Sequence, residues 1–153
     1  MKKLLVSMFV VGGVGLITGL SAAWALDLSK AACPVSGKAV EEKASVDYRG
    51  GQLYFCCNNC PEAFAGNTAK FATKANQQLA ATGQAQQGKC PISGKGVKEN
   101  TALDVGGVSV TFCCNGCRKK VDGAEGDQQL DLVFSDKAFE KAYTVGSEQP
   151  ASP

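Results

Sequence analysis

The sequence of 153 residues contains no histidine. Without an imidazole side chain, the chain lacks the general base of Ser-His and Cys-His catalysis. It also lacks the ligand on which most catalytic zinc sites depend. We therefore expect a protein that is not an enzyme, and any metal site must use other side chains.

The chain also lacks an excess of charge of either sign. It has 16 Lys and Arg residues against 14 Asp and Glu residues, and two of the basic residues are Lys2 and Lys3. If these two are removed during maturation, 14 basic residues face 14 acidic ones. Binding to nucleic acids or to acidic membranes relies on an excess of basic side chains. We therefore expect neither kind of partner.

A long apolar run lies at the N-terminus, where it is typical of a secretory signal. Lys2 and Lys3 precede apolar residues 4–20, and Ala23-Trp24-Ala25 has the small-x-small pattern of a cleavage site. We predict that residues 1–25 are a signal peptide and that the mature chain begins at Leu26. That chain would act in a bacterial periplasm or outside the cell, free of the membrane. The alternative is a retained membrane anchor, because the run is nearly long enough to span a bilayer.

The rest of the chain contains an internal repeat. Residues 33–60 recur as residues 90–117, with 14 of 28 positions identical and every cysteine displaced by 57. This similarity indicates a duplication. All eight cysteines lie in the two copies, four in each. We predict a first module over residues 26–83, a linker over 84–89, a second module over 90–143 and a flexible tail over 144–153.

Each copy is predicted to contain a cysteine-bearing turn, a β-hairpin and a helix. In the Cys-Pro-x-Ser-Gly-Lys turn, Pro and Gly favour a tight loop, and Ser36 and Ser93 are interpreted as holding it by hydrogen bonds. Helices are expected to start near Pro61 and near residues 118–120. Alternating apolar residues and glycine-rich turns predict strands over 44–48, 52–55, 102–105 and 108–112.

The two copies differ after the repeated segment. Copy one is predicted to continue as a helix over residues 68–81, and the glutamine-rich residues 77–87 are interpreted as a helix end and linker without chemistry. Copy two has a Gly- and Asp-rich loop over residues 122–127, then a predicted helix over 135–143 with Ser135 as its N-cap. The aromatic side chains expected in the core are Tyr48, Tyr54, Phe55, Phe64 and Phe71.

The cysteine spacing favours a metal site in each copy. A unit of this size buries only ~60% of its unfolded surface, so it needs a metal or disulfides for stability. Cys57 and Cys60 are three residues apart and Cys56 and Cys60 are four apart, so either pair can project from one side of a first helical turn. The turn at Cys33 supplies a further thiol. Four sulfurs per copy suit a tetrahedral site for Zn(II) or Cu(I), about one ion per repeat.

Disulfides are the main alternative, because an even cysteine count in a small exported protein is typical of a disulfide framework. Cys56 cannot bond to Cys57, since neighbouring Cα atoms are ~3.8 Å apart and a normal bridge needs more. Two bridges per repeat nevertheless remain feasible, as does a redox-controlled mixture of metal and disulfide states. The Cys-x-x-Cys segments are also typical of thiol–disulfide enzymes, but no βαβ pattern accompanies them.

The spacing Cys33-x22-Cys56-x3-Cys60, which is repeated from Cys90, resembles the TRASH family of metal trafficking, resistance and sensing domains. The surrounding Cys33-Pro34-Val35-Ser36-Gly37 and Tyr54-Phe55-Cys56-Cys57-Asn58-Asn59-Cys60 also resemble the related YHS family. The resemblance implies heavy-metal binding and a treble-clef-like fold. It also implies that the ligands are Cys33, Cys56, Cys60, Cys90, Cys113 and Cys117.

The chain departs from the YHS pattern at positions that concern the ligands. Cys33 stands where the YHS opening has Asp, and Ser36 stands where it has Cys. Cys57 and Cys114 stand where that family has Ser, and they are interpreted as fourth ligands or as thiols beside the ligands. The candidate metal ligands are therefore all eight cysteines, Cys33, Cys56, Cys57, Cys60, Cys90, Cys113, Cys114 and Cys117.

Together these patterns predict a small α+β protein made of two tandem treble-clef-like modules. Its predicted role is to bind zinc or copper for metal scavenging, trafficking or resistance, with a partner protein for metal transfer. The alternative is a structural or interaction module that is stapled by metal or disulfides and carries no cargo.

Overall fold

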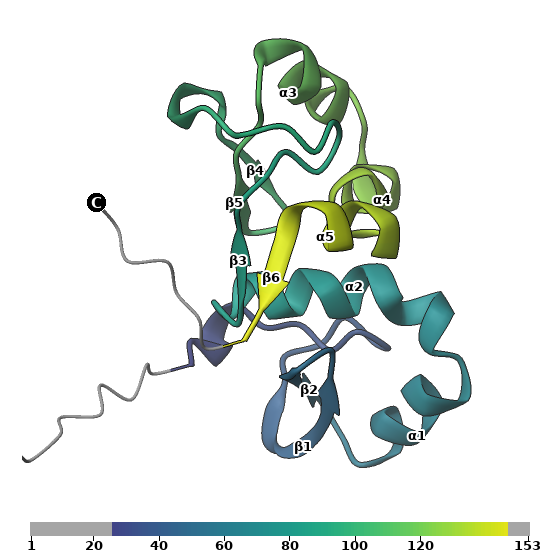
Figure 1. The fold of residues 1–153 in the computed structure, drawn as a ribbon. Coiled ribbons are helices and arrows are strands. Elements are labelled where there is room, and N and C mark those ends of the chain that lie inside the picture. The colour runs from purple at the N-terminus through teal and green to yellow at the C-terminus, as the bar shows by residue number, and fades with distance from the viewer. Residues whose placement is uncertain (1–25, 147–153) are drawn as a thin grey trace, which may run out of the picture.

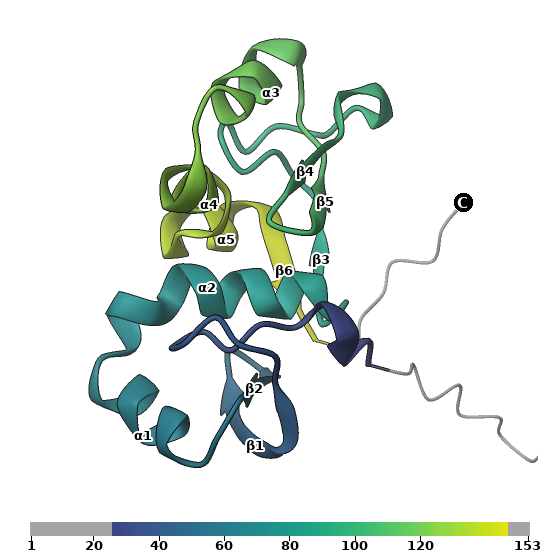
Figure 2. The same cartoon turned by 180° about the vertical axis from the view of Figure 1, so that it is seen from behind.

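The computed structural model describes residues 26–146 of the chain. The predicted signal peptide and residues 147–153 of the predicted tail lie outside the described residues. Within 26–146 the protein is a small α+β fold with five α-helices and three two-stranded sheets. None of the helices in this range is both long and apolar enough to cross a membrane. In Figures 1 and 2, α2 (Thr68–Ala81) crosses the middle of the molecule, with one repeat on each side.

The first repeat forms a hairpin followed by a short helix. A 3-10 helix over Leu28–Lys30 comes first, and then β1 (Glu41–Tyr48) pairs antiparallel with β2 (Gly51–Phe55). The two residues between the strands, Arg49 and Gly50, have φ angles of 52° and 85°. Two positive φ angles are typical of the type I′ turn, whose twist matches a tight hairpin. α1 (Asn59–Gly66) follows, so the predicted hairpin and helix are confirmed.

The second repeat has the same order with shorter strands. A 3-10 helix over Glu99–Thr101 precedes β4 (Leu103–Val105), which pairs with β5 (Val108–Val110), and α3 spans Asn115–Asp122. The predicted strand ran on to residue 112. It ends at Val110 because side chains, rather than a neighbouring strand, accept hydrogen bonds from the next backbone N–H groups. The Gln87 side chain accepts the Thr111 N–H, and the Thr101 hydroxyl accepts the Phe112 N–H.

α2 agrees with its predicted range of 68–81 at both ends. Asn67 caps its start by accepting a hydrogen bond from the Lys70 N–H at 3.2 Å. Just beyond the end of the helix, Gly83 has a φ of 77°, a left-handed conformation that glycine adopts without strain. Leu79, on the buried face of α2, is completely buried.

The C-terminal part of the second repeat folds into two helices. α4 spans Gly126–Phe134 and α5 spans Asp136–Ala142. The predicted loop over residues 122–127 is therefore shorter, because α3 continues to Asp122 and α4 begins at Gly126. The predicted final helix is confirmed as α5. Ser135 stands at its N-cap, but its side chain makes no capping hydrogen bond.

The predicted linker and part of the predicted tail pair with each other. β3 (Ala85–Gln87), within residues 84–89, forms an antiparallel sheet with β6 (Tyr143–Val145). The ring of Tyr143 stacks on Phe139 of α5 at 4.9 Å between centroids, and Tyr143 is buried. This pairing and packing place the end of the second repeat beside the segment that joins the two copies. Residues 84–89 are thus part of the fold, and residues 144 and 145 belong to a strand.

The two copies share a single hydrophobic core. Buried residues of both repeats belong to one continuous cluster, which includes Phe55 and Phe64 of the first and Phe112 of the second. Tyr48 and Phe71 pack against this cluster half-buried, and Tyr54 is also half-buried. Polar contacts join the copies as well. The buried Asn76 of α2 donates to the Phe134 carbonyl at 2.9 Å, and Arg49 pairs with Asp136 at 2.8 Å.

Because the core is shared, we expect the reduced chain of residues 26–153 to unfold in a single transition. Leu79→Ala should lower the free energy of unfolding by about 2–5 kcal/mol, through lost burial and the cavity that remains. The exposed Lys74→Ala on the same helix should change it by no more than about 0.5 kcal/mol. Urea titration followed by circular dichroism measures both. Two separable transitions, one for each repeat, would contradict a shared core.

Candidate metal centres

A tight turn presents the first cysteine of each copy. The Cys33 N–H donates to the Lys38 carbonyl at 2.8 Å, and the Gly37 N–H donates to the Cys33 carbonyl at 2.8 Å. Gly37 has a φ of 71°, which explains why glycine suits this position. The second copy repeats these bonds around Cys90, at 2.8 and 2.7 Å. Each turn closes on itself, and we call it the knuckle.

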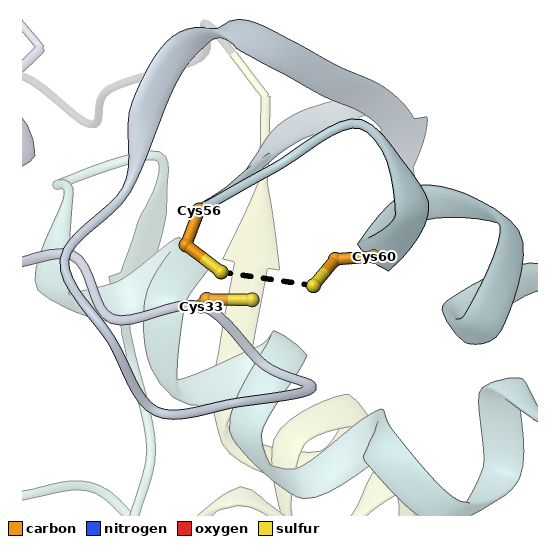
Figure 3. A group of neighbouring side chains, drawn as sticks. All are labelled: Cys33, Cys56 and Cys60. Carbon is orange, nitrogen blue, oxygen red and sulfur yellow. Dashed lines mark hydrogen bonds between the residues drawn. The ribbon is translucent and has the colours of Figure 1, made fainter.

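Three chain segments bring three sulfurs together in each copy. Cys33 comes from the knuckle, Cys56 from the residue after β2, and Cys60 from the first turn of α1 (Figure 3). Their Sγ atoms all lie within 4.8 Å of one another. The second copy gathers its thiols in the same way, from Cys90, Cys113 and Cys117. We call these groups the first and second clusters.

The sulfur separations suit a shared metal ion. The Sγ atoms of Cys56 and Cys60 are 3.7 Å apart, and those of Cys113 and Cys117 are also 3.7 Å apart. Two thiolates at a Zn–S distance of ~2.3 Å in tetrahedral geometry stand ~3.8 Å apart. A disulfide would need ~2.05 Å, and all eight cysteines are free thiols in this structure. Thiolate sulfur is a soft ligand that suits Zn(II), Cu(I) and similar ions.

Cys57 and Cys114 lie beside the clusters. Both side chains are exposed, and neither belongs to the group of three sulfurs in its copy. The Cys57 Sγ is 3.2 Å from the Cys60 Sγ and 3.9 Å from the Cys56 Sγ. The Cys114 Sγ is 3.8 Å from the Cys113 Sγ. The structure therefore brings together three of the four predicted ligands in each copy and places the fourth next to them, toward solvent.

Ser36 and Ser93 link each knuckle to its cluster. As predicted, the serine hydroxyl holds the turn, because Ser36 Oγ accepts the Lys38 N–H at 3.3 Å and Ser93 Oγ accepts the Lys95 N–H at 3.3 Å. The same oxygens lie 3.1 Å from the sulfurs of Cys56 and Cys113. Sequence reasoning missed this second contact, although the serine-to-cysteine spacing of 20 recurs in both copies.

The local electrostatics favour a thiolate on the knuckle cysteine. Burial opposes ionisation of Cys33, but hydrogen bonds from the Ser36 hydroxyl and from nearby backbone N–H groups outweigh it and lower its pKa to about 7. The same balance, with Ser93, lowers the pKa of Cys90 to about 6. Both thiols therefore ionise more readily than an ordinary cysteine.

The helix cysteines behave in the opposite way. The neighbouring Cys57 thiol and burial raise the pKa of Cys60. Burial and the neighbouring Cys113 and Cys114 thiols raise the pKa of Cys117 to about 12. In the absence of a cation, the helix cysteine therefore keeps its proton beside the knuckle thiolate. A bound metal ion would release that proton, because metal ligation requires the thiolate form.

Comparison of the chain with protein-family models, with curated proteins and with solved structures found no match. The TRASH and YHS resemblance therefore stays a prediction. The geometry shows two three-cysteine clusters that could each hold one ion, as in a cysteine-rich metal-binding module.

The hydroxyl of Ser36 gives a direct test of the cluster electrostatics. In Ser36→Ala the thiolate of Cys33 loses a hydrogen-bond donor, so its charged form is less stable and its pKa should rise from about 7 toward the ordinary thiol value. Thiolate absorbance in the ultraviolet, followed against pH on the reduced metal-free chain, measures the shift. Ser109→Ala, an exposed site on β5, is the control. An unchanged titration in Ser36→Ala would contradict this account.

Proposed function

We propose that the mature chain is an exported bacterial protein that scavenges or carries a soft metal ion, Zn(II) or Cu(I), with one ion in each cluster. The observation that carries the proposal is the duplicated set of three converging thiols, at separations that suit a common ion. A knuckle, a hairpin and a helix N-terminus around each cluster support a treble-clef-like module and the TRASH or YHS resemblance. The predicted signal peptide supports action in the periplasm or outside the cell.

The number of thiols in each cluster favours a role in transport or resistance. Three thiolates leave a position free around an ion that accepts four ligands. Cys57 and Cys114 are exposed, and their sulfurs lie 3.2 Å from the Cys60 Sγ and 3.8 Å from the Cys113 Sγ. Each can therefore add to the ion before another thiolate leaves. Such stepwise exchange allows transfer to a partner protein without release of a free ion. The role requires binding and transfer rather than catalysis, so no enzyme activity is proposed.

A second candidate is a structural module with a permanent metal. It is favoured by the burial of the knuckle cysteines, because Cys33 is 1% exposed and Cys90 is fully buried, and both belong to the shared core. A metal held there would contribute directly to folding. In that role the ion would leave only when the chain unfolds.

Metal and thiol content test the proposal directly. The mature chain, purified from its native compartment without reductant, should contain about two metal ions, one for each cluster. Nearly all of its thiols should be free after denaturation, and elemental analysis names the ion. Cys60→Ser should halve the metal content by removing the first cluster. A chain with no metal and no free thiols would be a disulfide-stapled module, and the proposal would fail.

Transfer kinetics separate carriage from a structural role. In the Cys57→Ser, Cys114→Ser double variant, the metal content should persist, while transfer to a chromophoric chelator at neutral pH should slow severalfold because the exchange thiols are gone. Asn58→Ser, an exposed neighbour of Cys57, should leave the rate unchanged. If the ion leaves the unsubstituted chain only as circular dichroism reports unfolding, the structural role is correct and carriage is not.

A further inference from the structure

A glutamine side chain connects the knuckle of the first copy to the strand that carries Cys56. Gln78 of α2 accepts the Tyr54 N–H at 2.8 Å. Its amide nitrogen donates to the Tyr54 carbonyl at 2.8 Å and to the Ala32 carbonyl at 2.8 Å. Tyr54 lies two residues before Cys56, and Ala32 directly precedes Cys33. One buried amide thus binds the backbone beside two of the three candidate ligands.

The second copy has the same connection, made by Gln87 of β3. This side chain accepts the Thr111 N–H at 2.9 Å. It donates to the Thr111 carbonyl at 2.6 Å and to the Lys89 carbonyl at 2.9 Å. Thr111 and Lys89 are the positions that correspond to Tyr54 and Ala32 after the displacement of 57. The backbone atoms that are bound are therefore equivalent in the two copies.

The glutamines themselves are not equivalent in the repeat. The position displaced by 57 from Gln78 is Ser135, and the position displaced by 57 from Gln87 in the other direction is Lys30. One glutamine comes from a helix and the other from a strand, and both lie between the duplicated segments. The same contact is therefore made twice from unrelated positions. Duplication of the sequence does not by itself account for it.

We propose that Gln78 and Gln87 are the positioning residues of the two metal centres, one for each cluster. This inference rests on the proposed metal-binding function. Each amide holds the backbone before the knuckle cysteine against the backbone before the strand cysteine, and so keeps those two sulfurs at ligand separation. Loss of the amide donor leaves two carbonyls that face each other without a shared partner, and the knuckle can then move away from the strand.

The test uses substitutions that keep the shape of the side chain and remove the donor. Gln87→Glu keeps an acceptor for the Thr111 N–H but gives up the donor to the Thr111 and Lys89 carbonyls. Gln87 is the first choice because it is half-buried, whereas Gln78 is only 2% exposed and Gln78→Glu carries more risk of misfolding. Each variant is made in the mature chain with Cys60→Ser, which leaves the second cluster, or with Cys117→Ser, which leaves the first.

The measurement is Co²⁺ affinity, together with the thiolate-to-cobalt charge-transfer absorption that reports ligand geometry. Gln87→Glu should weaken Co²⁺ binding to the second cluster by about 10–100-fold, the usual effect of removing a group that orients metal ligands. It should also change the absorption band while leaving the first cluster unaffected. Gln78→Glu should do the reverse.

Gln84→Glu is the matched control. Gln84 is half-buried and binds the N–H and carbonyl of Gln52 on β2, at 2.7 and 2.8 Å, and the Thr82 hydroxyl at 2.9 Å. None of these hydrogen bonds reaches a residue within two positions of a cysteine. Gln84→Glu should leave the affinity of both clusters unchanged. An equal loss in Gln84→Glu and Gln87→Glu, or equal losses at both clusters, would refute the inference, since the glutamines would then support only the fold. Unchanged Co²⁺ affinity of the second cluster in Gln87→Glu would refute the inference alone. An unsubstituted chain that binds no Co²⁺ would refute the proposed function and the inference together.

Discussion

The structure depends on bringing three sulfurs from three separate segments within 4.8 Å of one another, twice. Each sulfur comes from a different kind of backbone: a closed turn, the end of a strand and the first turn of a helix. Thiols gain little from this proximity by themselves, and ionised thiols repel one another. The backbone around the cluster therefore holds the sulfurs together. A bound cation would replace the repulsion between ionised thiols with attraction between each thiolate and the cation.

The surrounding fold holds the sulfurs in place by joining the two copies into one structure. A single repeat would bury only ~60% of its unfolded surface, which gives marginal stability, and here the two repeats share one core. α2 lies between them, and the pairing of β3 with β6 ties the end of the second copy to the segment after the first. The buried Cys33 and Cys90 belong to the resulting common core. Geometry at either cluster thus depends on packing that involves both copies.

Within each copy, burial divides the cysteines by chemical role. The knuckle cysteine is buried and surrounded by hydrogen-bond donors, which stabilise its thiolate despite the loss of water. Cys57 and Cys114 are exposed. A hydrogen bond from the Cys60 thiol lowers the pKa of Cys57, and a hydrogen bond from the Cys117 backbone N–H lowers the pKa of Cys114. Firm retention and ready exchange are opposing requirements for a metal carrier. A cluster of buried and half-buried thiols beside an exposed thiol offers a physical basis for both in the proposed carrier.

Local patterns in the sequence determined the features that need only neighbours along the chain. Identical residues reveal the repeat directly. Gly and Pro positions and apolar periodicity, which act over a few residues, predict the cysteine turns, the two hairpins and the bounds of α2. The family resemblance already implied the three cysteines that converge in each copy. Tertiary structure alone decided that Cys57 and Cys114 lie outside those groups, that residues 85–87 form β3, and that Gln78 and Gln87 bind the backbone next to the clusters. These features depend on contacts between segments far apart in the sequence. A glutamine in a polar stretch carries no local signal of the carbonyl that it will meet.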